Sequence, residues 1–158
     1  MNIPVNRPLI TKIDIETVSS QLELGWVSSE APVVAEFELQ MARYLGVRHA
    51  CAVSSGTAAL DIVWKLLNLS KGDNIVTSDF TIISCINQLI KDGVEVRTVD
   101  ISESDYNVSV EDVHPVIDKH TRAVLLPHIY GIPADIERFK QFCVDSRILL
   151  IEDFAETS

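Results

Sequence analysis

The sequence has little positive charge, few cysteines and no long apolar run. Thirteen Lys and Arg residues stand against twenty-three Asp and Glu residues, and the formal net charge of the 158 residues is −10. This balance argues against a surface that binds nucleic acid or an anionic membrane. Cys51, Cys85 and Cys143 are too few and too far apart for a disulfide framework or a paired-cysteine metal motif. They are typical of reduced core cysteines in a cytosolic protein.

Other functional segments are also missing. The longest largely apolar stretch, residues 50–69, contains Asp61 and Lys65, which is incompatible with a membrane span. The N-terminus has no basic segment followed by an apolar one, so we expect no signal peptide and a cytoplasmic location. The four histidines are scattered, and we expect no metal site. Neither the phosphate-binding loop with its lysine nor the three-glycine dinucleotide motif occurs.

Short apolar runs and amphipathic segments alternate through most of the chain. Apolar runs occupy residues 49–53, 74–77, 94–99, 123–127 and 148–151, and helical patterns occupy residues 57–69, 81–91, 110–117 and 134–145. Runs of Val, Ile and Leu with little alternation are typical of strands that are buried on both faces. The pattern predicts an α/β fold with a mostly parallel sheet and helices on both faces.

The first part of the chain lacks this alternation. Residues 13–24 and 32–45 have the apolar spacing of helices, and a glycine follows the end of each segment. We therefore expect residues 1–31 to form an arm, a short helix and a loop. Residues 32–158 are expected to form part of one larger domain.

A turn of small residues precedes the helical pattern at residues 57–69. Residues 54–57 read Ser-Ser-Gly-Thr and follow an apolar run. The uncovered amides of Gly56 and Thr57, with the hydroxyls of Ser55 and Thr57, would bind a phosphate at the positive end of the helix dipole. Alternatively, the turn only caps the helix, which is the commoner role of Ser and Thr at such a place.

The last apolar run ends in acidic residues, Glu152 and Asp153. An Asp at the end of a buried strand most often caps the next helix. It can also face a cationic group, because ligands gather at the carboxyl ends of parallel strands. A carboxylate beside a ring nitrogen keeps that nitrogen protonated, as pyridoxal phosphate (PLP) requires. Glu152 should point away from Asp153, since side chains alternate along a strand.

Several motifs occur in a fixed order. Residues 54–60 read Ser-Ser-Gly-Thr-Ala-Ala-Leu, residues 127–131 read Pro-His-Ile-Tyr-Gly, and residues 151–156 read Ile-Glu-Asp-Phe-Ala-Glu. Gly-Trp-Val-Ser-Ser at residues 25–29 and Lys-Gly-Asp at residues 71–73 accompany them. In order and spacing, over essentially the whole chain, the sequence resembles the DegT/DnrJ/StrS family of sugar aminotransferases.

The resemblance implies a fold and a reaction. It implies part of a fold-type-I PLP-dependent transferase large domain, with pyridoxal 5'-phosphate as cofactor. The reaction would move an amino group from an amino acid, commonly glutamate, to a keto group on a nucleotide-linked sugar. Family members are dimers with active sites at the subunit interface, so a homodimer is expected.

The resemblance also implies residue roles. Ser55, Gly56 and Thr57 would hold the cofactor phosphate. Asp153 would pair with the pyridine nitrogen, and Glu156 would lie near the ring hydroxyl. Ile82 would lie beside the face of the cofactor ring. Trp26 and Ser28 would lie beside the substrate sugar.

Two departures from the family pattern matter. Ile82 occupies a position that is usually aromatic, so its contact with the cofactor would be aliphatic. None of the six lysines matches the Ser-rich motif of the family's Schiff-base lysine or its place beyond Asp153. We therefore expect an N-terminal part of the enzyme, which is either a fragment of a longer gene product or one half of a split enzyme whose complementing C-terminal half supplies the lysine. Alternatives are a catalytically inert module that binds a phosphate or nucleotide sugar, a non-functional remnant, and an unrelated doubly wound domain.

Overall fold

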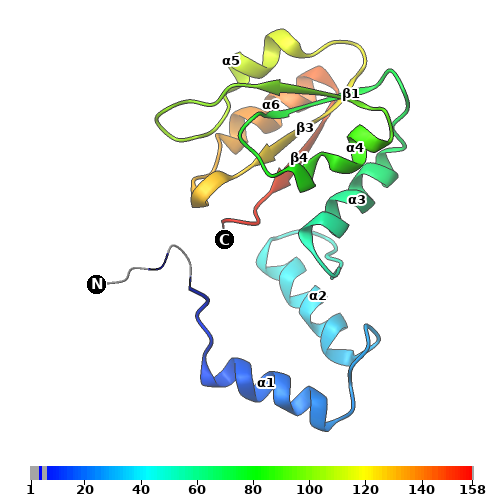
Figure 1. Ribbon diagram of the computed structural model, residues 1–158, viewed down its shortest axis with the longest axis vertical. Coiled ribbons are helices and arrows are strands. Elements are labelled where there is room, and N and C mark those ends of the chain that lie inside the picture. Colours follow the sequence, from blue (N-terminus) through cyan, green and yellow to red (C-terminus); the bar gives the residue numbers. More distant parts are fainter. Residues whose placement is uncertain (1–3, 5–6, 158) are drawn as a thin grey trace. The chain divides into compact units, whose positions relative to one another are not determined.

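A computed structural model describes residue 4 and residues 7–157, and contacts divide the chain into two compact units. The first unit, residues 1–52, contains helices α1 (Lys12–Glu23) and α2 (Pro32–Tyr44) (Figure 1). Both helices match predicted segments. The division that was expected near residue 31 concerns the domains of a longer enzyme and stays a prediction.

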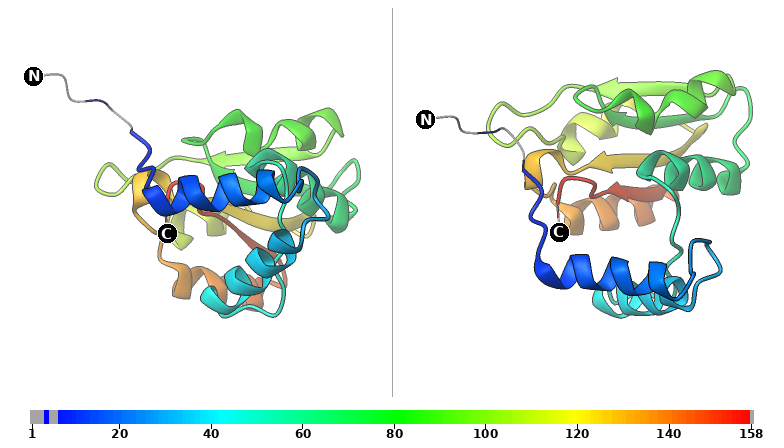
Figure 2. Two further views of the ribbon diagram at one scale, coloured as in Figure 1. Left: turned by 90° about the horizontal axis from the view of Figure 1, so that it is seen from below. Right: turned by 60° about the horizontal axis from the view of Figure 1, so that its bottom comes forward.

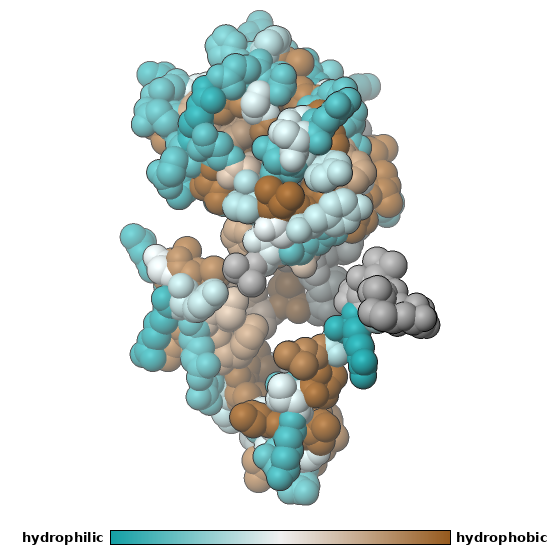
Figure 3. All heavy atoms as spheres, turned by 90° about the vertical axis from the view of Figure 1, so that its left-hand side faces the viewer, coloured by the Kyte–Doolittle hydropathy of each residue, from teal (hydrophilic) through white to brown (hydrophobic). Residues whose placement is uncertain are grey.

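Local chemistry explains where α1 and α2 begin. α1 begins with a capping box. The Thr11 N–H donates to Oδ2 of Asp14 at 2.7 Å, and the Asp14 N–H donates to Oγ1 of Thr11 at 3.3 Å. Pro32 occupies the first position of α2, where a missing N–H costs nothing. No residue of α1 is buried, and hydrophobic side chains lie on the molecular surface (Figure 3). These two helices bury few side chains on their own.

The second unit, residues 53–158, is built on a four-stranded parallel sheet. Its strands are β1 (Asn74–Ser78), β2 (Glu95–Val99), β3 (Thr121–Pro127) and β4 (Leu149–Asp153). They lie in the order β2-β1-β3-β4, so β2 and β4 form the edges. Helical crossovers join successive strands, which is what parallel pairing requires. Each strand matches a predicted apolar run.

Helices cover both faces of the sheet (Figure 2). One face packs against α3 (Gly56–Leu67) and α4 (Asn87–Lys91), and the other against α5 (Val110–Val113) and α6 (Ile136–Ser146). Three short 3-10 turns complete the unit at Ile83–Cys85, His114–Val116 and Ile129–Gly131. The prediction of an α/β fold with helices on both faces is confirmed.

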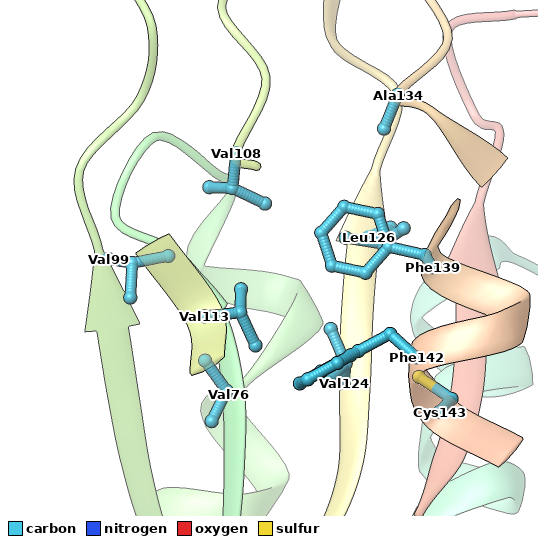
Figure 4. Packing of buried hydrophobic residues seen from close by; sticks show 10 residues of the cluster. All are labelled: Val76, Val99, Val108, Val113, Val124, Leu126, Ala134, Phe139, Phe142 and Cys143. Atoms are coloured by element: carbon cyan, nitrogen blue, oxygen red, sulfur yellow. The ribbon is translucent and has the colours of Figure 1, made fainter. Parts of the chain in front are cut away.

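Alternation along the central strands supplies two cores. On one face, Val76 of β1 and Val124 of β3 pack with Phe139 and Phe142 of α6 (Figure 4). On the other face, Ile75, Ala123 and Leu125 pack with helices α3 and α4. Trp64 of α3 belongs to this second core, and its indole N–H donates to the carbonyl oxygen of Cys85 at 3.1 Å.

Three predicted segments differ from the structure. Residues 49–53 were expected to be a strand, but they form no strand, and Val53 is exposed. A strand needs a neighbour for its backbone groups, and none of the four strands pairs with this segment. The helix expected over residues 110–117 is divided at Pro115, which has no N–H to continue the α-helical pattern. The helix expected over residues 81–91 is divided between a 3-10 turn and α4.

No helix in the described part of the chain is both long and apolar enough to cross a membrane.

Candidate functional site

The carboxyl ends of β1, β3 and β4 meet at one edge of the sheet, where parallel α/β proteins bind ligands. A small cavity of about 30 Å³ lies among the loops that follow these strands, and its lining includes Ile82, His128, Asp153 and Glu156. A second cavity of about 330 Å³ lies between the first turns of α3 and the end of β4. Gly56 and Asp153 both line this second cavity. The structure therefore brings the two main sequence motifs together.

The Ser-Ser-Gly-Thr turn begins α3. Ser55 is the N-cap residue, and its Oγ accepts a hydrogen bond from the Ala58 N–H at 3.1 Å. Ser55 therefore caps α3. The N–H groups of Gly56 and Thr57 lie in the first turn, where a helix offers no internal partner. A side-chain Cβ at Gly56 would meet no atom within 4 Å, so the space where a side chain would stand at this position is open.

Asp153 ends β4 and accepts hydrogen bonds through both carboxylate oxygens. Oδ1 accepts from the Ala155 N–H at 3.0 Å, and Oδ2 lies 3.2 Å from Sγ of Cys85. Burial raises the pKa of the Cys85 thiol, and the Asp153 carboxylate raises that pKa further. The thiol stays protonated and donates to the carboxylate. Asp153 is thus both the cap of a turn and a carboxylate that faces two cavities.

Buried His128 holds the end of β4 from the other face of the sheet. Its backbone N–H donates to the carbonyl oxygen of Asp153 at 3.0 Å, and its ring stacks on Phe154 with centroids 5.7 Å apart. Nδ1 accepts from the Ala134 N–H at 3.2 Å, and Nε2 lies 3.4 Å from Oε2 of Glu152. Glu152 and Asp153 therefore contact different partners, as strand alternation predicts. His128 is a structural residue of the site.

Glu156 and Ile82 complete the small cavity. Oε2 of Glu156 accepts from the Tyr130 N–H at 2.6 Å, which ties the chain after β4 to the turn after β3. Ile82 is exposed and lines the cavity beside them. Oγ1 of Thr81, also at this cavity, is buried without a hydrogen-bond partner among the described residues.

Sequence reasoning missed the role of Cys85. Cys85 was interpreted only as a core cysteine, because 68 positions separate it from Asp153 and no local pattern links them.

Trp26 and Ser28 belong to the first unit of the chain. Oγ of Ser28 accepts from the Glu30 N–H at 3.4 Å, and Trp26 is exposed. Their expected place near a substrate sugar stays a prediction.

Two kinds of residue do not gather at the sheet edge. No lysine of the described chain lines any of the cavities next to Asp153 and Glu156. Within the same residues, no group of three or more His, Cys, Asp or Glu side chains is placed to hold a metal ion.

Comparison with known proteins decides the family. The model of the DegT/DnrJ/EryC1/StrS aminotransferase family matches residues 8–158. The chain belongs to this family. Membership confirms the resemblance inferred from the motifs, and a structural neighbour with a TM-score of 0.90 confirms the expected fold, that of fold-type-I PLP-dependent transferases.

Relatives of known name and structure are similar to the chain over nearly its whole length. GDP-perosamine synthase of Vibrio cholerae is 35% identical over 154 residues, which are 98% of this chain and 42% of that protein. An aminotransferase structure from Psychrobacter cryohalolentis is 25% identical with a TM-score of 0.85, covering 96% of this chain and 38% of that one. NtdA from Bacillus subtilis, with bound cofactor PMP, is 26% identical with a TM-score of 0.83, and the match covers 94% of this chain and 35% of NtdA. The chain thus spans about 40% of the length of these relatives.

Proposed function

We propose that these 158 residues supply the phosphate-binding and ring-nitrogen-binding part of a PLP site in a sugar aminotransferase. The enzyme would transfer an amino group from an amino acid, glutamate, to a nucleotide-linked keto-sugar. The observation that carries the proposal is that Gly56, at the start of α3, and Asp153, at the end of β4, line the same cavity. Residues from opposite ends of the second unit thereby face one ligand-sized space. The relatives named as a GDP-sugar synthase and as a structure with PMP support it.

The start of α3 fits a phosphate. The amides of Gly56 and Thr57 point out of the first turn of a 12-residue helix, whose dipole favours an anion there. The open space beside Gly56 leaves room for the phosphate oxygens. The hydroxyls of Ser55 and Thr57 would add hydrogen bonds.

Asp153 fits a protonated pyridine nitrogen. Its carboxylate is held by the Ala155 N–H and the Cys85 thiol, so its orientation is set before a ligand arrives. When bound, PLP supplies the electron sink that lets an amino group leave one carbon and join another. Asp153 would hold the proton at the ring nitrogen, because an opposite charge nearby favours the cationic form.

Ile82 and Glu156 would contact the rest of the ring. Ile82 would lie against the ring face as an aliphatic surface, with weaker stacking than an aromatic side chain gives. Oε1 of Glu156 accepts no hydrogen bond from a described residue, while Oε2 is engaged by the Tyr130 N–H. Oε1 would accept the hydroxyl proton of the cofactor ring. Trp26 and Ser28 would contact the substrate sugar.

The Schiff-base lysine would come from elsewhere. Because no described lysine lines the cavities at Asp153, we propose that a further segment or a complementing polypeptide supplies it. In this account residues 1–31 are the N-terminal arm with the substrate-side loop, and residues 32–158 are the N-terminal part of the large domain. A homodimer in the cytoplasm would complete the enzyme.

The finding that no described lysine lines these cavities also favours a second candidate function. A chain whose cavities contain no lysine could bind a phosphate ligand or a nucleotide sugar without transferring an amino group. That inert module would bind PLP or nucleotide sugar alone, and would stay inactive when a complementing C-terminal polypeptide is added. Recovery of amino transfer on complementation favours the enzyme.

The proposal predicts that the phosphate of PLP contributes much of its affinity. In equilibrium dialysis, the 158-residue chain should bind PLP at least tenfold more tightly than pyridoxal, which lacks the phosphate. Charge-assisted hydrogen bonds to a helix N-terminus supply about that difference, roughly 1.5–3 kcal/mol. Ser55→Gly removes the hydroxyl and introduces a residue that is also tolerated at the N-cap. This substitution should reduce the ratio of PLP affinity to pyridoxal affinity. Equal binding of PLP and pyridoxal would contradict a phosphate site at α3.

A further inference from the structure

Cys85 contacts both of the elements that would hold the cofactor. It ends the 3-10 turn Ile83–Cys85 and lines the small cavity together with Asp153, the last residue of β4. Only 5% of Cys85 is exposed, and it packs in the core that includes α3. The turn proposed to bind the phosphate begins that same helix. Cys85 therefore lies between the phosphate part and the ring-nitrogen part of the candidate site.

Hydrogen bonds to its backbone hold Cys85 in place. The Cys85 N–H donates to the carbonyl oxygen of Ile82 at 2.9 Å, and the Cys85 carbonyl oxygen accepts from the indole N–H of Trp64 at 3.1 Å. Trp64 belongs to α3 and is only 3% exposed. A buried indole N–H without a partner is costly, so this bond fixes the position of Cys85 relative to α3.

The thiol of Cys85 connects this anchor to Asp153. Sγ lies 3.2 Å from Oδ2 of Asp153, and the Ala155 N–H donates to Oδ1 at 3.0 Å, so each carboxylate oxygen has one donor. Among the described residues, no lysine, arginine or histidine forms an ion pair with Asp153. The carboxylate is thus held in place without being neutralised by a neighbouring cation.

A thiol suits this place because it is a weak hydrogen-bond donor. A charged donor would also hold the carboxylate, but it would stabilise the anion and weaken its attraction for a proton on a ring nitrogen. His128 and Glu156 are the other titratable residues that line the small cavity, and their side chains face Glu152 and the Tyr130 N–H. The thiol therefore limits the motion of the carboxylate and leaves its charge available.

We propose that Cys85 is a positioning residue of the cofactor site. Its thiol holds the Asp153 carboxylate toward the place of the pyridine nitrogen, and its backbone ties that carboxylate to the helix that would bind the phosphate. The inference deepens the proposed function and rests on it, because the role requires PLP at Asp153. Cys85 acts through Asp153 and needs no contact with a reacting atom.

The first test is PLP binding by the 158-residue chain in equilibrium dialysis. Cys85→Ala removes the donor and should raise the Kd for PLP about three- to tenfold. Cys85→Ser keeps a donor at this place and should restore most of the affinity. Cys143→Ala is the matched control, because Cys143 is equally buried but packs in the core on the other face of the sheet. This control should leave the Kd unchanged, and thermal unfolding checks that each variant folds.

A spectroscopic measurement separates positioning from packing. PLP labelled with ¹⁵N at the ring nitrogen is bound to each variant, and the ¹⁵N chemical shift reports whether this nitrogen carries a proton. In the native chain and in Cys85→Ser, the nitrogen should stay protonated to a higher pH than in Cys85→Ala. A cysteine with a merely structural role would change the stability of the chain without changing this titration.

The contact can also be tested without cofactor, even if Cys85→Ala does not fold. Cysteines labelled with ¹³C at Cβ are titrated by NMR, while circular dichroism checks that the chain stays folded at each pH. Burial and the Asp153 carboxylate raise the pKa of the Cys85 thiol, so Asp153→Asn should lower that pKa. Burial alone raises the pKa of Cys143 to about 11, and this value should be the same in Asp153→Asn.

The outcomes keep the two proposals apart. The inference alone would be overturned by an unchanged PLP Kd in Cys85→Ala, by an equal effect of Cys143→Ala, or by a ring-nitrogen titration that is identical in all variants. An unchanged Cys85 thiol pKa in Asp153→Asn would also overturn it. Absence of PLP binding by the native chain, with the thiol still coupled to Asp153, would overturn the cofactor proposal, and the positioning role would fall with it.

Discussion

Replacing Asp153 with Asn is expected to weaken PLP binding by the 158-residue chain about 10- to 100-fold. A hydrogen bond to a charged group contributes roughly 1.5–3 kcal/mol, and each 1.4 kcal/mol is a factor of ten. Asn keeps the size of the side chain, but it has no negative charge to hold a proton on the pyridine nitrogen. Equilibrium dialysis, with the absorption spectrum of the bound cofactor, measures the change.

Asp100→Asn is the matched control for this substitution. Asp100 also follows the end of a strand, β2, but its carboxylate contacts only its neighbour's backbone, the Ile101 N–H at 2.8 Å. It lines none of the cavities at Asp153. Equal PLP affinity in Asp153→Asn, Asp100→Asn and the native chain would refute the role proposed for Asp153.

The largest effect on stability is expected for Phe139→Ala. Phe139 of α6 is 0% exposed and packs in the core between the sheet and this helix (Figure 4). Truncation of a buried Phe to Ala costs about 3–5 kcal/mol, from lost burial and from the cavity left behind. Domains are stable by only about 5–15 kcal/mol, so much of the stability would be lost. The change should appear as a large fall in the urea midpoint, followed by circular dichroism at fixed protein concentration.

Val144→Ala on the same helix tests whether this loss comes from the core. Val144 is exposed, so its truncation should change the urea midpoint little. Similar midpoints for Phe139→Ala and Val144→Ala would mean that the core between the sheet and α6 contributes little.

The centre of the sheet could be predicted from the sequence because β1 and β3 are buried on both faces. β1 and β3 are almost entirely apolar, or carry small hydroxyl residues, and such runs are recognised without knowledge of the tertiary structure. Residues 49–53, His-Ala-Cys-Ala-Val, are also largely apolar, yet form no strand. Composition does not reveal whether a neighbouring strand is present, and the presence of that neighbour decides whether a segment forms a strand.

The candidate site could be predicted only where local rules apply. The Ser55 cap and the opposite directions of Glu152 and Asp153 follow from helix and strand geometry. The Cys85 contact with Asp153 could not be predicted, because it depends on packing between distant parts of the chain. The same holds for the mutual packing of the Phe80, Tyr106 and Tyr130 rings, which come from three separate loops.

The central claim is that this chain contacts the phosphate and ring nitrogen of PLP but does not supply the lysine that bonds to it. The most direct test is borohydride reduction of the 158-residue chain with PLP, followed by intact and peptide mass analysis. Dialysis of the unreduced sample should show about one PLP bound per chain. After reduction and denaturation, we expect no stoichiometric adduct on any one of the six lysines. A stoichiometric adduct on one lysine, lost in Asp153→Asn, would contradict the claim.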